Sequence, residues 1–126
     1  MFPSPVTGSV FYDDEVLYAC LAFHPWADGH VIIALKEHFT DLNDLPELLY
    51  IHLMKCVFKV RKAMLKVYET DLVYLHCMNE AKHVHIHLIP RKPGGPTGFD
   101  LLISQMREPS DLTDFSKIPL LSSALQ

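Results

Sequence analysis

The sequence lacks the features that mark several large classes of protein. None of its 126 residues belongs to an apolar run approaching the ~18–20 residues that a membrane helix needs. Residues 1–5 lack the basic and then apolar pattern of a signal peptide. Its three cysteines, Cys20, Cys56 and Cys77, form no CxxC pair, which favours a reducing compartment over a disulfide scaffold. We therefore expect a soluble cytoplasmic protein with no membrane partner.

An excess of basic charge is also absent. The 11 Lys and Arg residues face 15 Asp and Glu residues, giving a net charge of -4, which argues against binding of a long nucleic acid by a broad basic surface. A small nucleotide in a local pocket stays compatible with this charge. With 49% hydrophobic and 21% charged residues, the composition is that of an ordinary folded protein.

The length predicts one domain over residues 1–126, with a core at about 10–103. Residues 1–9 and about 109–126 are expected to be irregular or weakly ordered. The fold class that we expect is α+β, an antiparallel sheet of about five strands with one long helix packed on it. The β-prone runs cover residues 10–12, 16–23, 30–35, 72–78 and a histidine-containing run that ends at Pro90.

The long helix is expected from Asp44, as its N-cap, to about Tyr68. Pro46 lies in its first turn, and apolar residues then recur at three- and four-residue steps. Residues 99–103 are expected to add a short strand or helix.

The most informative pattern is the alternation of histidine with aliphatic residues between positions 83 and 88. In a strand, successive side chains point to opposite faces, so His83, His85 and His87 are expected to share one face. Three chemistries remain open for them. They could be structural; they could bind a metal ion with help from His30, His76 or Asp28; or one neutral imidazole could attack phosphorus while the others assist.

Two segments resemble the histidine triad family. Residues 83–91, His-Val-His-Ile-His-Leu-Ile-Pro-Arg, are similar to its His-φ-His-φ-His-φ-φ signature, where φ is apolar. Residues 29–38, Gly-His-Val-Ile-Ile-Ala-Leu-Lys-Glu-His, are similar to its upstream Gly-His strand segment. The resemblance spans about residues 10–92 and implies a HIT-like fold of the class expected above.

The resemblance also implies a function, that of a nucleotide hydrolase or nucleotidyl transferase acting on the α-phosphate of a nucleotide conjugate. Such conjugates are dinucleoside polyphosphates, phosphoramidates and adenylylated compounds. His85 is then the nucleophile that forms a covalent nucleotidyl-histidine, His87 and His30 contact the phosphate, and His83 orients His85. The resemblance further implies a homodimer, no cofactor and no metal on the catalytic histidines.

Two positions depart from the family pattern. Many members hold the ribose with Asp or Asn eight residues before the first-strand histidine, where this chain has Ala22, whose methyl group accepts no hydrogen bond. The loop between Asn79 and the triad has only three residues, Glu80, Ala81 and Lys82, and lacks the family's usual hydroxyl or amide donor. Asn79 and Lys82 are therefore the candidate phosphate contacts.

The aromatic residues Phe23 and Trp26 are candidates for stacking on a base. The departures leave two alternatives to the enzyme: a nucleotide-binding or sensor module with little turnover, and, on weaker grounds, a metallohydrolase that uses the histidines as ligands. His76 is interpreted as a sheet residue, and His38 as a local hydrogen-bonding residue.

Overall fold

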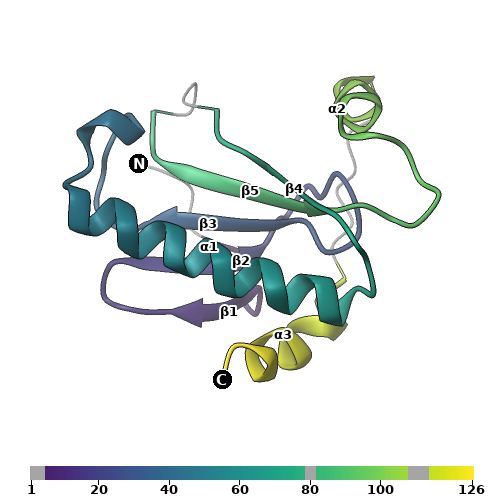
Figure 1. Cartoon of the computed structure of the whole chain (residues 1–126), viewed down its shortest axis with the longest axis horizontal. Helices are drawn as coiled ribbons and strands as arrows, with labels where there is room; N and C mark the ends of the chain where they lie inside the picture. The colour runs from purple at the N-terminus through teal and green to yellow at the C-terminus, as the bar shows by residue number, and fades with distance from the viewer. Residues whose placement is uncertain (1–4, 79–81, 108–113) are drawn as a thin grey trace.

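The centre of the molecule is a five-stranded antiparallel sheet, seen in a computed structural model that describes residues 5–78, 82–107 and 114–126 (Figure 1). The strands, in chain order, are β1 (Val10–Asp13), β2 (Leu17–Leu21), β3 (Val31–Leu35), β4 (Val73–His76) and β5 (His85–Pro90). Their spatial order is β1-β2-β3-β5-β4, and every neighbouring pair is antiparallel. The expected α+β class, with its five-stranded antiparallel sheet, is confirmed.

The strand β5 lies inside the sheet, between β3 and β4, because its backbone pairs with both. Ile86 and Leu88 are buried in the core, whereas His85 and His87 alternate with them and so point to the opposite face. The strand begins at His85, so only two of the three histidines are strand residues. His83 lies in the turn before it, where Lys82 takes the left-handed φ of 54°.

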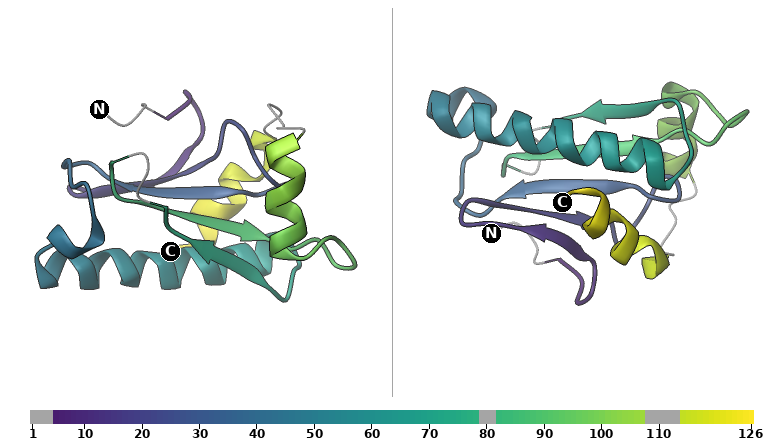
Figure 2. Two further views of the ribbon diagram at one scale, coloured as in Figure 1. Left: turned by 90° about the horizontal axis from the view of Figure 1, so that it is seen from above. Right: turned by 60° about the horizontal axis from the view of Figure 1, so that its bottom comes forward.

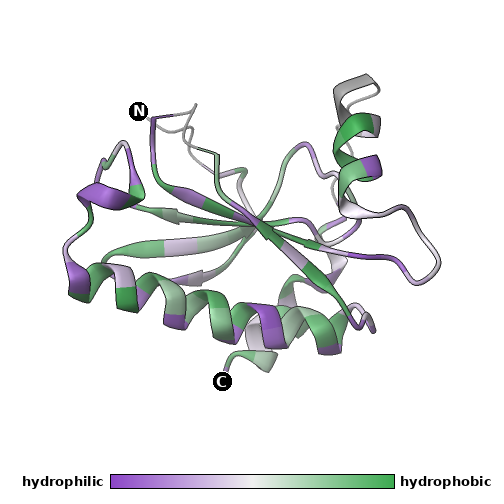
Figure 3. Cartoon of the chain, turned by 45° about the horizontal axis from the view of Figure 1, so that its top comes forward, coloured by the Kyte–Doolittle hydropathy of each residue, from purple (hydrophilic) through white to green (hydrophobic). Residues whose placement is uncertain are grey.

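One face of the sheet is covered by the helix α1 (Glu47–Val67) (Figure 2). It buries its apolar side, which consists of Leu53, Cys56, Val57, Val60, Ala63 and Met64. Figure 3 shows apolar and polar residues along the whole helix, and some apolar residues, such as Leu48 and Phe58, stay exposed on its outer side. Burial of the inner side against the sheet stabilises the helix.

The expected start of α1 at Asp44 is wrong. Asp44 ends a short 3-10 helix, η1 (Leu42–Asp44), whose N-cap is Asp41. Leu45 is extended, with ψ at 134°, because a residue followed by proline is driven out of the helical region. Pro46 is therefore the N-cap of α1, and it makes no side-chain capping hydrogen bond.

The C-terminal segment also differs from the irregular tail that we expected. It contains a 3-10 helix, η3 (Phe115–Lys117), and the helix α3 (Ile118–Ala124), which packs against α1 and β1 (Figure 2). Leu121 of α3 is fully buried in the core. The helix α2 (Gly98–Arg107) follows β5, so the segment around 99–103 is helical. Across the described residues, no helix has both the length and the apolarity to span a bilayer.

Candidate active site

His85 opens β5, and its ring is oriented by the backbone of His83. The Nδ1 of His85 lies 2.7 Å from the carbonyl oxygen of His83. A carbonyl only accepts hydrogen bonds, so Nδ1 carries the proton and donates it. The neutral ring then has its lone pair on Nε2, which is the atom that can attack an electrophile.

His83 is itself fixed by the chain around it. Its Nε2–H donates to the carbonyl oxygen of Leu35, at 2.6 Å. Its Nδ1 lies 3.3 Å from Nδ1 of His38, and this nitrogen accepts because the ring proton is on Nε2. His83 therefore supports the carbonyl that orients His85. His38 makes a hydrogen bond, but its partner lies 45 residues away in the chain and is not the local one that we expected.

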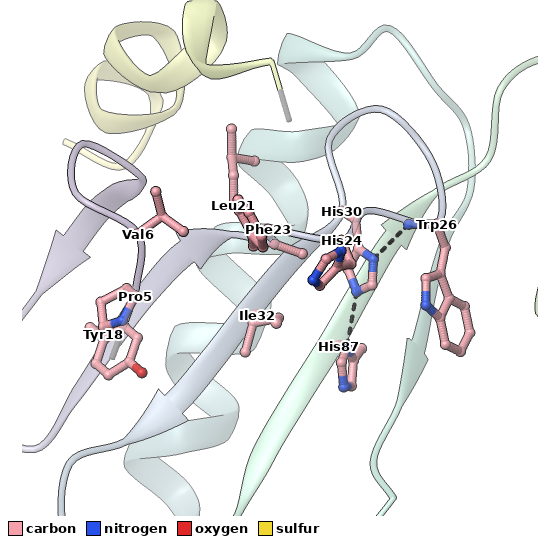
Figure 4. A pocket seen from close by; sticks show the side chains of 11 residues that line it. Pro5, Val6, Tyr18, Leu21, Phe23, His24, Trp26, His30, Ile32 and His87 are labelled. Carbon is pink, nitrogen blue, oxygen red and sulfur yellow. Dashed lines mark hydrogen bonds between the residues drawn. The ribbon is translucent and has the colours of Figure 1, made fainter. Parts of the chain in front are cut away.

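A second chain of hydrogen bonds joins the loop after β2 to β5 (Figure 4). The backbone N–H of Trp26 donates to Nδ1 of His30, at 3.0 Å. His30 therefore has its proton on Nε2, which donates to Nδ1 of His87, at 2.8 Å. It follows that neutral His87 has its own proton on Nε2, a donor suited to a phosphate oxygen.

Burial keeps these two rings neutral. His30 is only 2% exposed, and loss of hydration lowers its pKa to about 3, with a smaller effect from nearby His76. Burial also lowers the pKa of His87 to about 2, with further electrostatic effects from His30, His76 and His85. At neutral pH both rings are uncharged, so the direction of each hydrogen bond above is maintained.

His76 belongs to this cluster, although we interpreted it from the sequence as a sheet residue and considered it only as a possible metal ligand. In the sheet it lies directly opposite His87, and the two rings are stacked, with centroids 4.4 Å apart and planes at 13°. The sequence alone could not show this, because the register of the two strands decides it. The paired residues of β4 and β5 have numbers with a constant odd sum, which brings even-numbered His76 to the face of His85 and His87.

A pocket of about 320 Å³ lies beside His30 and His87 (Figure 4). Both predicted base-stacking residues, Phe23 and Trp26, line it. Phe23 is 52% exposed, whereas the indole of Trp26 stacks on His76 at 4.9 Å. The residues that line the pocket are Pro5, Val6, Tyr18, Leu21, Ala22, Phe23, His24, Trp26, His30, Ile32 and His87.

Of the two candidate phosphate contacts before β5, the structure describes only Lys82, which does not line this pocket. Asn79 lies outside the described residues. Lys82 is exposed, and no hydrogen bond or ion pair joins it to another described residue. The prediction that these residues contact the substrate therefore stays a prediction.

A metal-binding arrangement was one alternative for the histidines. Within the ranges that the structure describes, no group of three or more His, Cys, Asp or Glu side chains is placed to hold a metal ion. Instead, nitrogens of His30 and His87 face each other in a hydrogen bond, and Nδ1 of His85 faces a carbonyl. These three nitrogens are thus already used within the protein.

Comparisons with known proteins agree with the geometry. A family model described as the HIT domain matches residues 5–94. Adenosine 5'-monophosphoramidase HNT1 of Saccharomyces cerevisiae is 32% identical over 129 residues, which cover 97% of this chain and 75% of that protein. The asymmetrical bis(5'-nucleosyl)-tetraphosphatase of Schizosaccharomyces pombe is 27% identical over 110 residues, which cover 82% of this chain and 60% of that protein.

Solved structures show the same fold. A HIT-like protein involved in cell-cycle regulation from Bartonella henselae superimposes with a TM-score of 0.71 at 24% sequence identity. The match covers 92% of this chain and 85% of that chain. The arrangement of sheet and long helix is therefore shared at low sequence identity.

Proposed function

Because the chain belongs to the histidine triad (HIT) family, we propose that it is a nucleotide hydrolase or nucleotidyl transferase acting at the α-phosphate of a nucleotide conjugate. The observation that carries this proposal is the hydrogen bond from Nδ1 of His85 to the carbonyl oxygen of His83. It supports a nucleophilic role for Nε2 of His85. The relatives named above are a phosphoramidase and a dinucleoside tetraphosphatase, which supports the substrate class.

In the first step Nε2 of His85 attacks the α-phosphorus and forms a P–N bond. The bond from phosphorus to the leaving group breaks, and the leaving group departs with the electron pair. The positive charge that develops on the His85 ring is stabilised by the carbonyl oxygen of His83, 2.7 Å from Nδ1. Nε2–H of His87 donates to an oxygen of the phosphoryl group, since its ring lies 4.7 Å from that of His85.

In the second step water attacks phosphorus and the P–N bond breaks, so the electron pair returns to Nε2 of His85. The water loses a proton to solvent, and a nucleoside monophosphate is released. With another nucleophile in place of water, the same step is a nucleotidyl transfer. The pocket beside His30 and His87 is the proposed place of the nucleoside, with Phe23 against its base.

The proposal is tested with a substrate panel of adenosine phosphoramidate, a dinucleoside polyphosphate and adenylyl sulfate. Release of AMP from at least one of them, measured by chromatography, is expected for the wild type. His85→Ala should lower kcat by roughly a thousandfold or more, since no other group replaces a nucleophile. A substrate labelled on the α-phosphate should leave an alkali-stable, acid-labile label on the wild type and none on His85→Ala.

His52→Gln is the matched control, because His52 lies on α1 and pairs with Asp14, away from the pocket. It should keep the wild-type rate. Turnover that His85→Ala retains would contradict the proposed mechanism.

The second candidate, a nucleotide-binding or sensor module with little turnover, is favoured by one observation. The described residues that line the pocket include no carboxylate or amide side chain, so the ribose hydroxyls find no strong side-chain acceptor there. The same panel separates the two functions. Saturable binding of AMP without release of product from any substrate would select the module.

We also propose that the protein is a homodimer, as expected from the family resemblance. The outer side of α1 carries exposed apolar residues, including Leu48 (81% exposed) and Phe58 (61% exposed), and β4 is an edge strand. Light scattering at micromolar concentration should give twice the mass of one chain, and Phe58→Glu should reduce it. A monomeric wild type would contradict this proposal.

A further inference from the structure

Three aromatic rings lie nearly parallel at the edge of the candidate site. The ring of His76 stacks on His87, with centroids 4.4 Å apart and planes at 13°. The indole of Trp26 stacks on His76 at 4.9 Å and 22°. Trp26 and His87 are also close to parallel, at 6.2 Å and 18°. His87 therefore has aromatic neighbours from a second strand and from the loop after β2.

These stacking contacts and two hydrogen bonds form a closed cycle of residues, because Trp26 takes part with both its backbone and its indole. Its backbone N–H donates to His30, and His30 donates to His87. His87 stacks on His76, and His76 stacks on the indole of Trp26. We refer to these four residues as the closed contact ring. Residue 26 thus acts on His87 by two routes, one through hydrogen bonds and one through stacked faces.

The ring of His76 is held by its faces and not by its nitrogens. Both of its ring nitrogens are buried, and neither has a hydrogen-bond partner among the described residues. A buried polar atom without a partner costs free energy, and such atoms call for an explanation. Because His76 lies opposite His87 in the sheet, its unpaired nitrogens lie beside the proposed site of phosphoryl transfer.

We propose that His76 and Trp26 are positioning residues that fix the plane of the His87 ring, an inference that rests on the proposed function. A hydrogen bond to Nδ1 fixes one atom of the His87 ring but leaves the ring free to tilt about that point. A stacked face removes the tilt. The Nε2–H of His87 is then aimed in one direction, toward the phosphoryl group next to His85.

The test compares two substitutions of His76 on the same strand. His76→Leu removes the flat face and should lower kcat about tenfold, because small errors of position at a reacting group cost up to about a hundredfold. KM should change little, since His76 does not line the pocket. His76→Phe keeps a flat face without nitrogens and should restore kcat to near the wild-type value.

Tyr74→Leu is the matched control, because Tyr74 lies two residues earlier on β4 and on the same face, opposite Ile89. It loses an aromatic ring outside the closed contact ring, and kcat should stay unchanged. Trp26 is the only tryptophan of the chain, so its fluorescence reports the stack directly. Acrylamide should quench it more strongly in His76→Leu than in the wild type, His76→Phe or Tyr74→Leu.

Either of two results would overturn the inference. A wild-type kcat in His76→Leu would show that the stack positions nothing. A His76→Phe variant that is folded by its urea transition, yet as impaired as His76→Leu, would assign the role to the ring nitrogens instead. Failure of the wild type to release any nucleoside monophosphate would contradict the proposed function and this inference together, whereas the two results above contradict the inference alone.

Discussion

At the scale of single residues, a neutral histidine has two ring nitrogens but one proton, so a single hydrogen bond decides what the other nitrogen can do. His85 donates from Nδ1 to a carbonyl, which leaves a lone pair on Nε2. His30 accepts at Nδ1 from an amide, which puts its proton on Nε2 and, through the next bond, gives His87 a proton on Nε2 as well. The same residue type thus supplies both a nucleophile and a hydrogen-bond donor.

The position of His30 depends on the glycine before it. Gly29 has a φ of +88°, and a Cβ built there would lie 2.6 Å from the ring of Tyr68. Gly29→Ala should therefore lower the free energy of unfolding by more than the ~1–2 kcal/mol that a left-handed φ costs a non-glycine residue. Urea unfolding measures the loss, and kcat should fall as His30 is displaced.

Gly8→Ala separates the cost of the left-handed φ from the cost of the contact with Tyr68. Gly8 has a φ of +86°, and a Cβ added there would meet no neighbouring atom within 4 Å, so it reports the cost of φ alone. In the Tyr68→Leu background, Gly29→Ala should be less destabilising than in the wild type. Equal losses at Gly8 and Gly29 would show that contact with Tyr68 does not matter.

At the scale of elements, the sequence predicts best where many residues repeat one pattern. The sheet strands and α1 carry such patterns, and their predicted positions agree with the structure within a few residues. The first residue of α1 was missed because its place depends on a local competition, in which Asp41 caps η1 and Pro46 forces Leu45 to be extended. The helix α3 was missed because only Leu121 of its seven residues is fully buried, and one buried residue makes no periodic pattern.

The contribution of α3 can be measured at that residue. Leu121→Ala should lower the free energy of unfolding by about 2–5 kcal/mol, the usual cost of a cavity at a buried leucine. Leu120→Ala is the control, because Leu120 is 52% exposed and its truncation should change stability by about 0.5 kcal/mol or less. Equal effects in urea unfolding would mean that α3 does not belong to the core.

At the scale of the whole molecule, the candidate site joins parts of the chain that lie far apart in sequence. Residues 26 and 30 come from the loop after β2, residue 76 from β4, and residues 83–87 from the turn before β5 and the first residues of that strand. The histidine alternation points to the last of these, and the family resemblance adds His30. The stacking of Trp26, His76 and His87 depends on the exact register of β4 and β5, which no local pattern in the sequence specifies.

This cluster of neutral histidines links the stability of the molecule to pH. His30 and His87 have pKa values of about 3 and about 2 in the folded chain, against an ordinary value near 6.5 when unfolded. Below pH 6.5 the unfolded chain therefore takes up protons that the folded chain does not, and the free energy of unfolding falls as the pH falls. The pKa of Asp14 is also lowered, to about 2, but its effect begins only below the ordinary value near 3.8.

The window from pH 7 to pH 5 thus isolates the histidines, and each of the two should contribute a loss of about 2 kcal/mol across it. Urea unfolding at pH 7, 6 and 5 measures the sum, to which His76 also contributes because burial lowers its pKa as well. His30→Gln removes one titrating group, so its stability should decline less steeply with falling pH, by about one proton in the linkage slope. Leu120→Ala, which removes no titratable group at an exposed position, should keep the wild-type slope. A free energy of unfolding that stays constant or rises from pH 7 to pH 5 would show that the fold does not hold these rings neutral. It would also contradict the hydrogen-bond directions assigned to His30 and His87.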